Sequence, residues 1–254
     1  MNYKLVYITP NSEYQTYIES VSEEEYDKIM DCIGKLQSAM LAKDYFTIVK
    51  DNINDLVSFY TKMDVMGKEN FPTLNRLTYN ILAVFYAWIE YYESNYKSIF
   101  TSIKSKYYDN HFSYRMMYNL RTFMTHCEMA VTEMQVHFDE GEFFVYIEPT
   151  KLLANSGRLQ KSFLPELQAM ADSGQKIDLK KLINDFSTMF SNIHKELLKA
   201  LEPEIQNILN EMKPYLKLEN GALMNCCLQE KDTGKHVYSI SSFLGLFINK
   251  MAES

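Results

Sequence analysis

Glycine and proline are scarce in this chain, whose 254 residues include eight glycines and six prolines. A chain so poor in both lacks the turn residues of an all-β fold and the composition of a long disordered linker. Cysteine is equally rare, and none of the four cysteines has the CxxC spacing of a zinc site. The composition therefore favours a mainly α-helical protein, and we expect it to need neither a metal ion nor another cofactor.

Long apolar runs are also missing. The most apolar stretch, around residues 81–89, is followed by Glu90 and Glu93 before it reaches the roughly 20 apolar residues that a membrane span requires. The first residues lack the charged segment and apolar run that mark a secretory signal. We therefore expect a soluble cytoplasmic protein with no membrane partner.

One segment departs from the acidic balance of the whole chain. The formal net charge of −7 opposes non-specific attraction to polyanions. Between Lys97 and His126, however, five Lys or Arg residues accompany a single acid, Asp109, and four tyrosines lie among them. Cations interleaved with aromatic rings are typical of surfaces that bind single-stranded nucleic acid. RNA is the partner that this segment favours.

The spacing of apolar residues predicts the secondary structure. The segment 3–8 is typical of a strand, and Ser22 with Glu25 forms a capping box that begins a helix. Spacings of three and four predict further helices over residues 46–60, 74–105, 112–133, one or two within 150–172, 178–203, where Pro203 should kink or end the helix, and 242–251. Alternation predicts β-hairpins at about 132–148 and 223–240.

The helix predicted over 112–133 carries Arg121 and His126, five positions apart. Because the chain has 22 lysines and only four arginines, an arginine here suits a role that needs its planar fork, such as phosphate binding. At 100° per residue the two side chains diverge by about 140°, which prevents a strong direct hydrogen bond on a straight helix. They could both reach one phosphate, or converge with the same pair from a twofold-related subunit.

The string Leu120-Arg121-Thr122-Phe123-Met124-Thr125-His126 resembles the Arg-x4-His signature of the HEPN superfamily, helical proteins common among bacterial toxins and antiviral defence systems. The resemblance implies an antiparallel helical bundle with a HEPN-like core at about 22–135. With the elements predicted outside that core, we expect one or two small β-hairpins and a single mainly helical domain over 1–254, with a hairpin at about 132–148 and a helical C-terminal part at 150–254. The resemblance also implies a homodimer, and an antitoxin or another defence-system protein is an expected partner.

The resemblance assigns metal-independent RNA cleavage to Arg121 and His126. Histidine titrates near neutral pH and so transfers protons, whereas arginine holds a phosphate and offsets the charge of the transition state. Glu90 or Glu93 is a candidate for orienting either catalytic side chain. The residues expected to bind RNA are Lys104, Lys106, Arg115, Tyr118 and Thr122, with the rings of Tyr107, Tyr108 and Tyr114 stacking on unpaired bases.

Two other functions fit the same residues. The polar face of the helix at 112–133 could belong to a non-catalytic binding module that contacts nucleic acid or a partner protein. Alternatively, Arg121 and His126 could bond only to neighbouring helices in a structural or regulatory protein. His137, His194 and His236 lack the spacing of metal ligands, and the chain has no P-loop, Rossmann or nucleophile-elbow motif.

Overall fold

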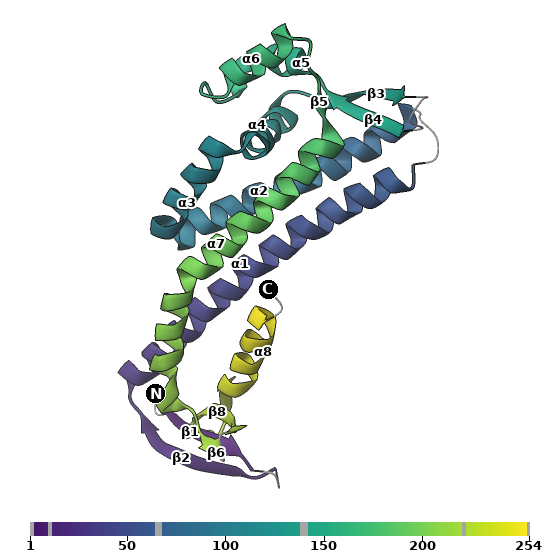
Figure 1. The fold of residues 1–254 in the computed structure, drawn as a ribbon. Helices are drawn as coiled ribbons and strands as arrows, with labels where there is room; N and C mark the ends of the chain where they lie inside the picture. Colours follow the sequence, from purple (N-terminus) through teal and green to yellow (C-terminus); the bar gives the residue numbers. More distant parts are fainter. Residues whose placement is uncertain (1–2, 10–11, 64–67, 138–141, 220–221, 253–254) are drawn as a thin grey trace. The chain divides into compact units, whose positions relative to one another are not determined.

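The computed structural model describes residues 3–9, 12–63, 68–137, 142–219 and 222–252 (Figure 1). These residues form eight α-helices and nine short β-strands, which confirms the mainly α-helical class with small antiparallel sheets. The chain divides into two compact units. Unit 1 comprises residues 1–43 and 201–254, and unit 2 comprises residues 44–200. The single domain expected over 1–254 and the HEPN-like core at 22–135 stay predictions.

Unit 1 contains a four-stranded antiparallel sheet in the order β2-β1-β8-β9. The strand expected at 3–8 and the pairing expected within 223–240 are confirmed, whereas β2 was not expected. A closing helix follows the last strand, also as expected. The elements are β1 (Tyr3–Ile8), β2 (Tyr14–Val21), β6 (Leu218–Glu219), β7 (Ala222–Leu223), β8 (Asn225–Glu230), β9 (His236–Ser239) and α8 (Ile240–Ala252).

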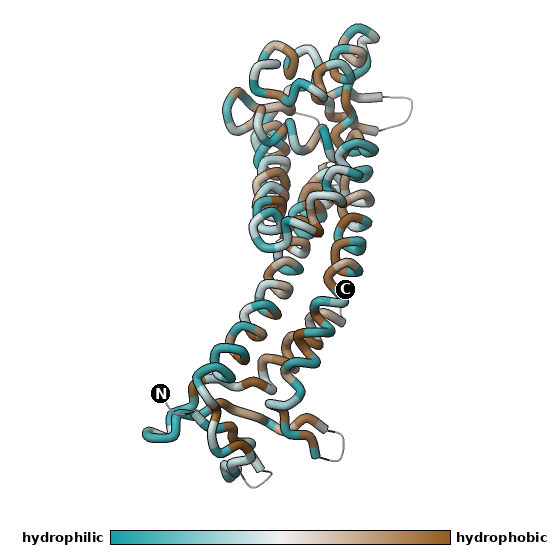
Figure 2. Tube along the Cα trace, turned by 90° about the vertical axis from the view of Figure 1, so that its left-hand side faces the viewer, coloured by the Kyte–Doolittle hydropathy of each residue, from teal (hydrophilic) through white to brown (hydrophobic). Residues whose placement is uncertain are grey.

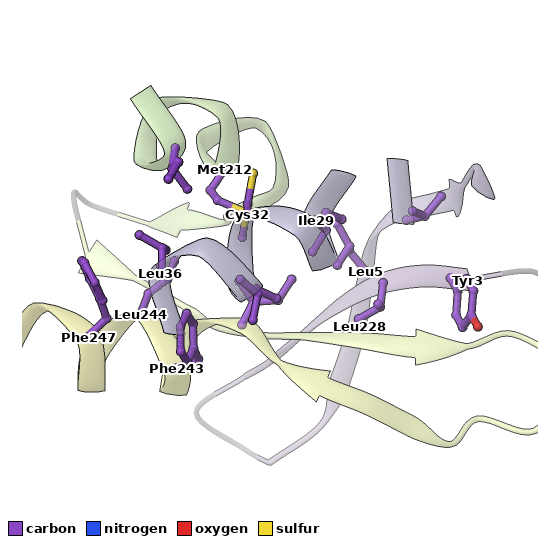
Figure 3. Packing of buried hydrophobic residues seen from close by; sticks show 14 of the residues in the cluster. Tyr3, Leu5, Ile29, Cys32, Leu36, Met212, Leu228, Phe243, Leu244 and Phe247 are labelled. Carbon is purple, nitrogen blue, oxygen red and sulfur yellow. The ribbon is translucent and has the colours of Figure 1, made fainter. Parts of the chain in front are cut away.

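The core of unit 1 lies between this sheet and three helices (Figure 3). Leu5 and Leu228 enter it from paired strands, since they are direct partners in the β1–β8 register. The helices α1 (Glu23–Thr61), α7 (Leu179–Met212) and α8 supply most of the remaining side chains, and α1 and α7 also extend into unit 2. Further members labelled in Figure 3 are Tyr3, Ile29, Cys32, Leu36, Met212, Phe243, Leu244 and Phe247.

The capping box at the start of α1 forms as expected. The backbone N–H of Ser22 donates to the Glu25 carboxylate at 2.8 Å, and the Glu25 N–H donates to the Ser22 hydroxyl at 3.2 Å. The Ser22 hydroxyl also donates to the Glu25 carboxylate at 2.9 Å, and the hydrogen bonds from the Ser22 N–H and hydroxyl lower the pKa of Glu25. The prediction that a separate helix covers 46–60 is wrong, because α1 continues to Thr61 and no glycine or proline interrupts it between its two apolar stripes.

Unit 2 places helices around the second half of α1 and most of α7. Teal and brown residues alternate along these long helices, as amphipathic helices require (Figure 2). Of the two outcomes expected at Pro203, a kink or an end of the helix, the end is not observed, since α7 continues to Met212. The other elements are α2 (Phe71–Asn95), α3 (Lys97–Asn110), α4 (Phe112–His126), β3 (Val131–His137), β4 (Glu142–Ile147), α5 (Pro149–Leu153), α6 (Leu164–Asp172) and β5 (Ile177–Asp178).

Two further helix predictions in unit 2 differ from the structure. The helix expected over 74–105 is two helices, α2 and α3, separated at Tyr96. The helix expected over 112–133 ends at His126, and the following residues enter β3. The hairpin expected at 132–148 is confirmed in its strands β3 and β4, while its turn lies outside the described residues. No helix in the described part of the chain is both long and apolar enough to cross a membrane.

Phe85 lies at the centre of the aromatic core of unit 2. Its ring centroid is 4.9–6.0 Å from those of Trp88, Tyr114, Phe186 and Phe190. All five side chains are buried, and they come from α2, α4 and α7. Each such ring pair contributes about 0.5–1.5 kcal/mol beyond the burial of its area. This aromatic core fixes α4 against α2.

A buried asparagine ties α2 to the first residue of β3. The Asn75 amide donates to the carbonyl oxygens of Val131 at 2.8 Å and Phe71 at 3.0 Å. Its Oδ1 accepts a hydrogen bond from the Val131 N–H at 3.0 Å. Asn75 therefore pairs both backbone groups of Val131 as a neighbouring strand would.

Replacing Asn75 with alanine is expected to lower the free energy of unfolding by about 2–3 kcal/mol, because the buried backbone groups of Val131 lose their partners. Asn95→Ala is the matched control, since Asn95 lies on the same helix and donates only to the exposed carbonyl of Tyr91. The control should change stability by less than about 0.5 kcal/mol. Urea unfolding measures both, and equal effects would contradict the role of Asn75.

Candidate functional site

The helix α4 carries both residues of the Arg-x4-His motif. Its buried face consists of apolar residues expected from the spacing, among them Met116, Leu120 and Phe123. Asn119 was expected on the polar face but is buried, because its Oδ1 accepts the Gln160 N–H at 2.7 Å and its amide donates back within α4. Arg121 and His126 lie on the part of α4 that remains partly or fully exposed.

Arg121 lies over an aromatic ring of the neighbouring helix. Its guanidinium carbon is 3.7 Å from the centroid of Tyr86 on α2. Both side chains are partly exposed, and no carboxylate pairs with Arg121 among the residues that the structure describes. A guanidinium packed on a ring face keeps its N–H edge for hydrogen bonds. The ring thus holds Arg121 in place, while the N–H edge of its guanidinium is free to form hydrogen bonds.

His126 is the last residue of α4 and is exposed. The helix is regular to this point, because the Cys127 N–H still donates to the Phe123 carbonyl at 2.8 Å. The divergence of about 140° between Arg121 and His126 therefore applies to the folded protein. Within one chain the two side chains flank α4 rather than face each other.

A row of three tyrosines extends from Arg121 along α4. The ring centroids of Tyr86 and Tyr118 are 6.2 Å apart, and those of Tyr118 and Tyr108 are 6.1 Å apart. The Lys104 ammonium lies 5.7 Å from the Tyr118 centroid. Burial raises the pKa of Tyr118. We call Tyr86, Tyr108, Tyr118, Lys104 and Arg121 the tyrosine row.

Next to the tyrosine row is a shallow pocket, which polar side chains line for the most part. Lys104, Tyr108 and Tyr118 belong both to the row and to this pocket. Lys104 also forms an ion pair with Glu93 of α2, so Glu93 contacts a lysine rather than either motif residue. The remaining lining residues are Ser105, Asp109 and Gln160.

Two predicted RNA-binding cations lie outside the tyrosine row. Lys106 pairs with Glu196 of α7 at 2.9 Å, and this hydrogen-bonded pair lowers the pKa of Glu196 and raises that of Lys106. Arg115 donates twice to the Glu166 carboxylate, at 2.9 Å each, and also to the carbonyl oxygens of Tyr108 and Asp109. Four of its five N–H donors are thus used within the fold.

Of the other residues predicted to contact RNA, some are buried and others are partly exposed. Tyr107 and Tyr114 are 7% and 0% exposed, so the prediction that their rings stack on bases is wrong. Tyr107 on α3 and Tyr114 on α4 belong to the core, so neither ring is available to a base. Thr122 is partly exposed beside Arg121, and Tyr118 is partly exposed in the row. The RNA-binding roles of Lys104, Lys106, Arg115, Tyr118 and Thr122 stay predictions.

Sequence reasoning named Glu93 of α2 as a candidate but missed two tyrosines of that helix. Tyr79, Tyr86 and Glu93 recur at intervals of seven and therefore lie on one stripe of that helix. Tyr86 supports Arg121, Glu93 pairs with Lys104, and Tyr79 lines a mainly apolar groove with Arg76. The recurrence at every seventh residue was the signal in the sequence that could have revealed Tyr79 and Tyr86. Around the motif, the described part of the chain holds no cluster of three or more His, Cys, Asp or Glu residues that could bind a metal ion.

No protein-family model, curated protein or solved structure matches this chain. The HEPN resemblance therefore depends on the Arg-x4-His motif.

The contacts of Arg115 predict a structural role. Arg115→Lys should lower the free energy of unfolding by about 1–2 kcal/mol, because one ammonium cannot replace a fork that binds a carboxylate and two carbonyls together. Arg158→Lys, at an exposed arginine of the same unit, should change it by less than about 0.5 kcal/mol. Thermal or urea unfolding compares them. A stable Arg115→Lys protein with weakened RNA binding would instead support the predicted role in RNA binding.

Proposed function

We propose that the protein is a metal-independent endoribonuclease of HEPN type, with Arg121 and His126 as its catalytic residues. The observation that carries the proposal is the state of Arg121, which is fixed on the Tyr86 ring with no carboxylate partner among the described residues. An exposed histidine ends the same helix. The resemblance of the motif supports a cytoplasmic role in a toxin or antiviral defence system.

Arg121 would bind the phosphate. A guanidinium that is held by a ring needs little further ordering, so more of its binding energy remains for the charge that develops in the transition state. A lysine could supply the charge but not two parallel hydrogen bonds to phosphate oxygens. The packing on Tyr86 therefore suits a residue that positions and stabilises a phosphoryl centre.

The reaction needs no metal or other reactant. The ribose 2′-oxygen attacks the adjacent phosphorus while a histidine takes the 2′-hydroxyl proton, and the bond from phosphorus to the 5′-oxygen breaks. A water molecule gives a proton to the leaving 5′-oxygen, and the histidine releases to the solvent the proton that it took. The products are a 2′,3′-cyclic phosphate and a 5′-hydroxyl. DNA lacks the attacking group.

A shared site follows from the geometry of α4. Because Arg121 and His126 diverge by about 140° around the helix, the pair of one chain is poorly placed to act on the two sides of one phosphate. A twofold-related copy would bring its His126 to the Arg121 side. We therefore place each active centre between Arg121 of one subunit and His126 of the other.

The tyrosine row supports binding of unpaired RNA beside this centre. Its rings are partly exposed, spaced about 6 Å apart, and accompanied by Lys104 and Arg121. Bases can stack on such rings at about 1–3 kcal/mol each, and the cations lie near the path of the phosphates. The alternative function, a non-catalytic module that binds nucleic acid or a protein partner, draws on the same surface.

Purified protein is expected to cleave single-stranded RNA in the presence of EDTA. Arg121→Ala and His126→Ala should each reduce the cleavage rate at least 100-fold, because each removes a group that acts on the reacting phosphate. Arg121→Lys should recover little. Gel analysis of a 5′-labelled RNA gives the rates.

Arg158→Ala and His236→Ala are the matched controls, since they remove exposed side chains of the same two types that belong neither to α4 nor to the tyrosine row. Both should cleave RNA at the wild-type rate. RNA binding without cleavage, weakened by Tyr118→Ala, would favour the binding module. The absence of both RNA binding and RNA cleavage would refute the proposal.

Mixing two inactive variants tests the shared site. Random pairing of Arg121→Ala with His126→Ala subunits makes half of the dimers mixed, and each mixed dimer has one centre with both native side chains. Co-refolded mixtures should therefore regain about a quarter of the wild-type rate. A mixture as inactive as its components, while sedimentation shows mixed dimers, would contradict a centre built from two subunits.

A further inference from the structure

A cavity of about 320 Å³ lies in unit 2 away from the tyrosine row. It is formed by the end of α1, the beginning of α7 and Phe143 of β4. Its volume is at the lower end of the roughly 300–1,000 Å³ range of small-molecule sites. The cavity is therefore large enough for a ligand of about ten non-hydrogen atoms.

The walls of this cavity are mostly apolar. Leu56 and Ile183 are fully buried on its inner side, and Met63 is 8% exposed. Val57 and Phe143 complete the apolar wall at the more exposed side. These residues suit an aliphatic chain or a small ring.

Two polar side chains of α7 line the same cavity, the Lys180 ammonium and the Asn184 amide. Both are exposed, and the described residues provide neither an ion pair nor a side-chain hydrogen bond for them. Both groups can donate a hydrogen bond to a ligand. Tyr60 also lines the cavity, but its hydroxyl has almost no accessible surface and takes no part in the site.

The charge near the cavity favours an anion. Lys180 lies in the first turn of α7, where the helix dipole adds positive potential. Asp178 caps that helix by accepting the Lys181 N–H at 3.1 Å, and no acidic residue is among the described residues that line the cavity.

We propose that this cavity binds a small organic carboxylate, with its apolar body against Leu56, Ile183 and Phe143 and its carboxylate near Lys180 and Asn184. The carboxylate would accept hydrogen bonds from these two side chains. This site does not depend on the proposed ribonuclease activity, since it shares no residue with the tyrosine row or the motif.

Octanoate is the probe, and 1-octanol is its neutral match. Titration calorimetry with the full chain should show saturable binding of octanoate to one site. Lys180→Met should weaken octanoate binding at least fivefold without affecting 1-octanol. Val57→Trp, at a position that is 40% exposed, should fill the cavity and abolish both. Lys195→Met, at an exposed lysine of α7 outside the cavity, is the matched control and should bind like the wild type.

Each other result would overturn the proposal. Equal affinity for octanoate and 1-octanol, or unchanged binding by Lys180→Met, would remove the carboxylate specificity. Absence of saturable binding, or full binding by a folded Val57→Trp protein, would remove the site. Circular dichroism and unfolding midpoints show whether each variant is folded.

Discussion

The packing of Phe85 against its aromatic neighbours is the contact on which the candidate site depends. This ring touches Tyr114 of α4 and both Phe186 and Phe190 of α7. Because protein interiors are close-packed, rings from three helices in mutual contact leave little freedom in the position of any of them. The position of α4 on α2 is therefore set from the core side.

The accessible side of α4 follows from that constraint. With Tyr114 and Phe123 buried, Tyr118 and Arg121 come out beside α2, where Tyr86 meets both of them. A core contact thus decides which ring lies beneath the arginine. The same geometry separates the motif residues around the helix, which is why the proposed chemistry needs a second subunit.

Part of the fold could be predicted from local signals. The capping box at Ser22, the start of α7 near residue 178 and the hairpin strands formed as expected, because each depends on neighbouring residues. The break at Tyr96 depends on distant contacts instead. The rings of Trp88 and Phe100 are 5.4 Å apart, whereas twelve residues of straight helix would separate them by about 18 Å.

The end of α4 illustrates a competition that the sequence alone does not resolve. The apolar residues after Cys127 fit either a continued helix or a strand. Val131 pairs with Ile147 and with the side chain of Asn75, and these long-range partners select the strand. β2 escaped prediction because a bulge in its pairing with β1 breaks simple alternation.

The motif itself was found from the sequence, and the structure defines what surrounds it. Arg121 and His126 are accessible, but Arg115 and Lys106 are held by Glu166 and Glu196. Tyr86 belongs to another helix, so no local spacing connects it with Arg121. The sequence therefore identifies Arg121 and His126 as candidates, whereas the ring that packs against Arg121 and the ion pairs of its neighbours can be known only from the structure.

The chemical nature of the RNA ends tests the central claim most directly. Mass spectrometry of an oligonucleotide incubated with the protein in EDTA identifies both new ends. Attack by the 2′-hydroxyl predicts a 2′,3′-cyclic phosphate and a 5′-hydroxyl. Intact RNA, or a 3′-hydroxyl with a 5′-phosphate, would contradict cleavage by Arg121 and His126.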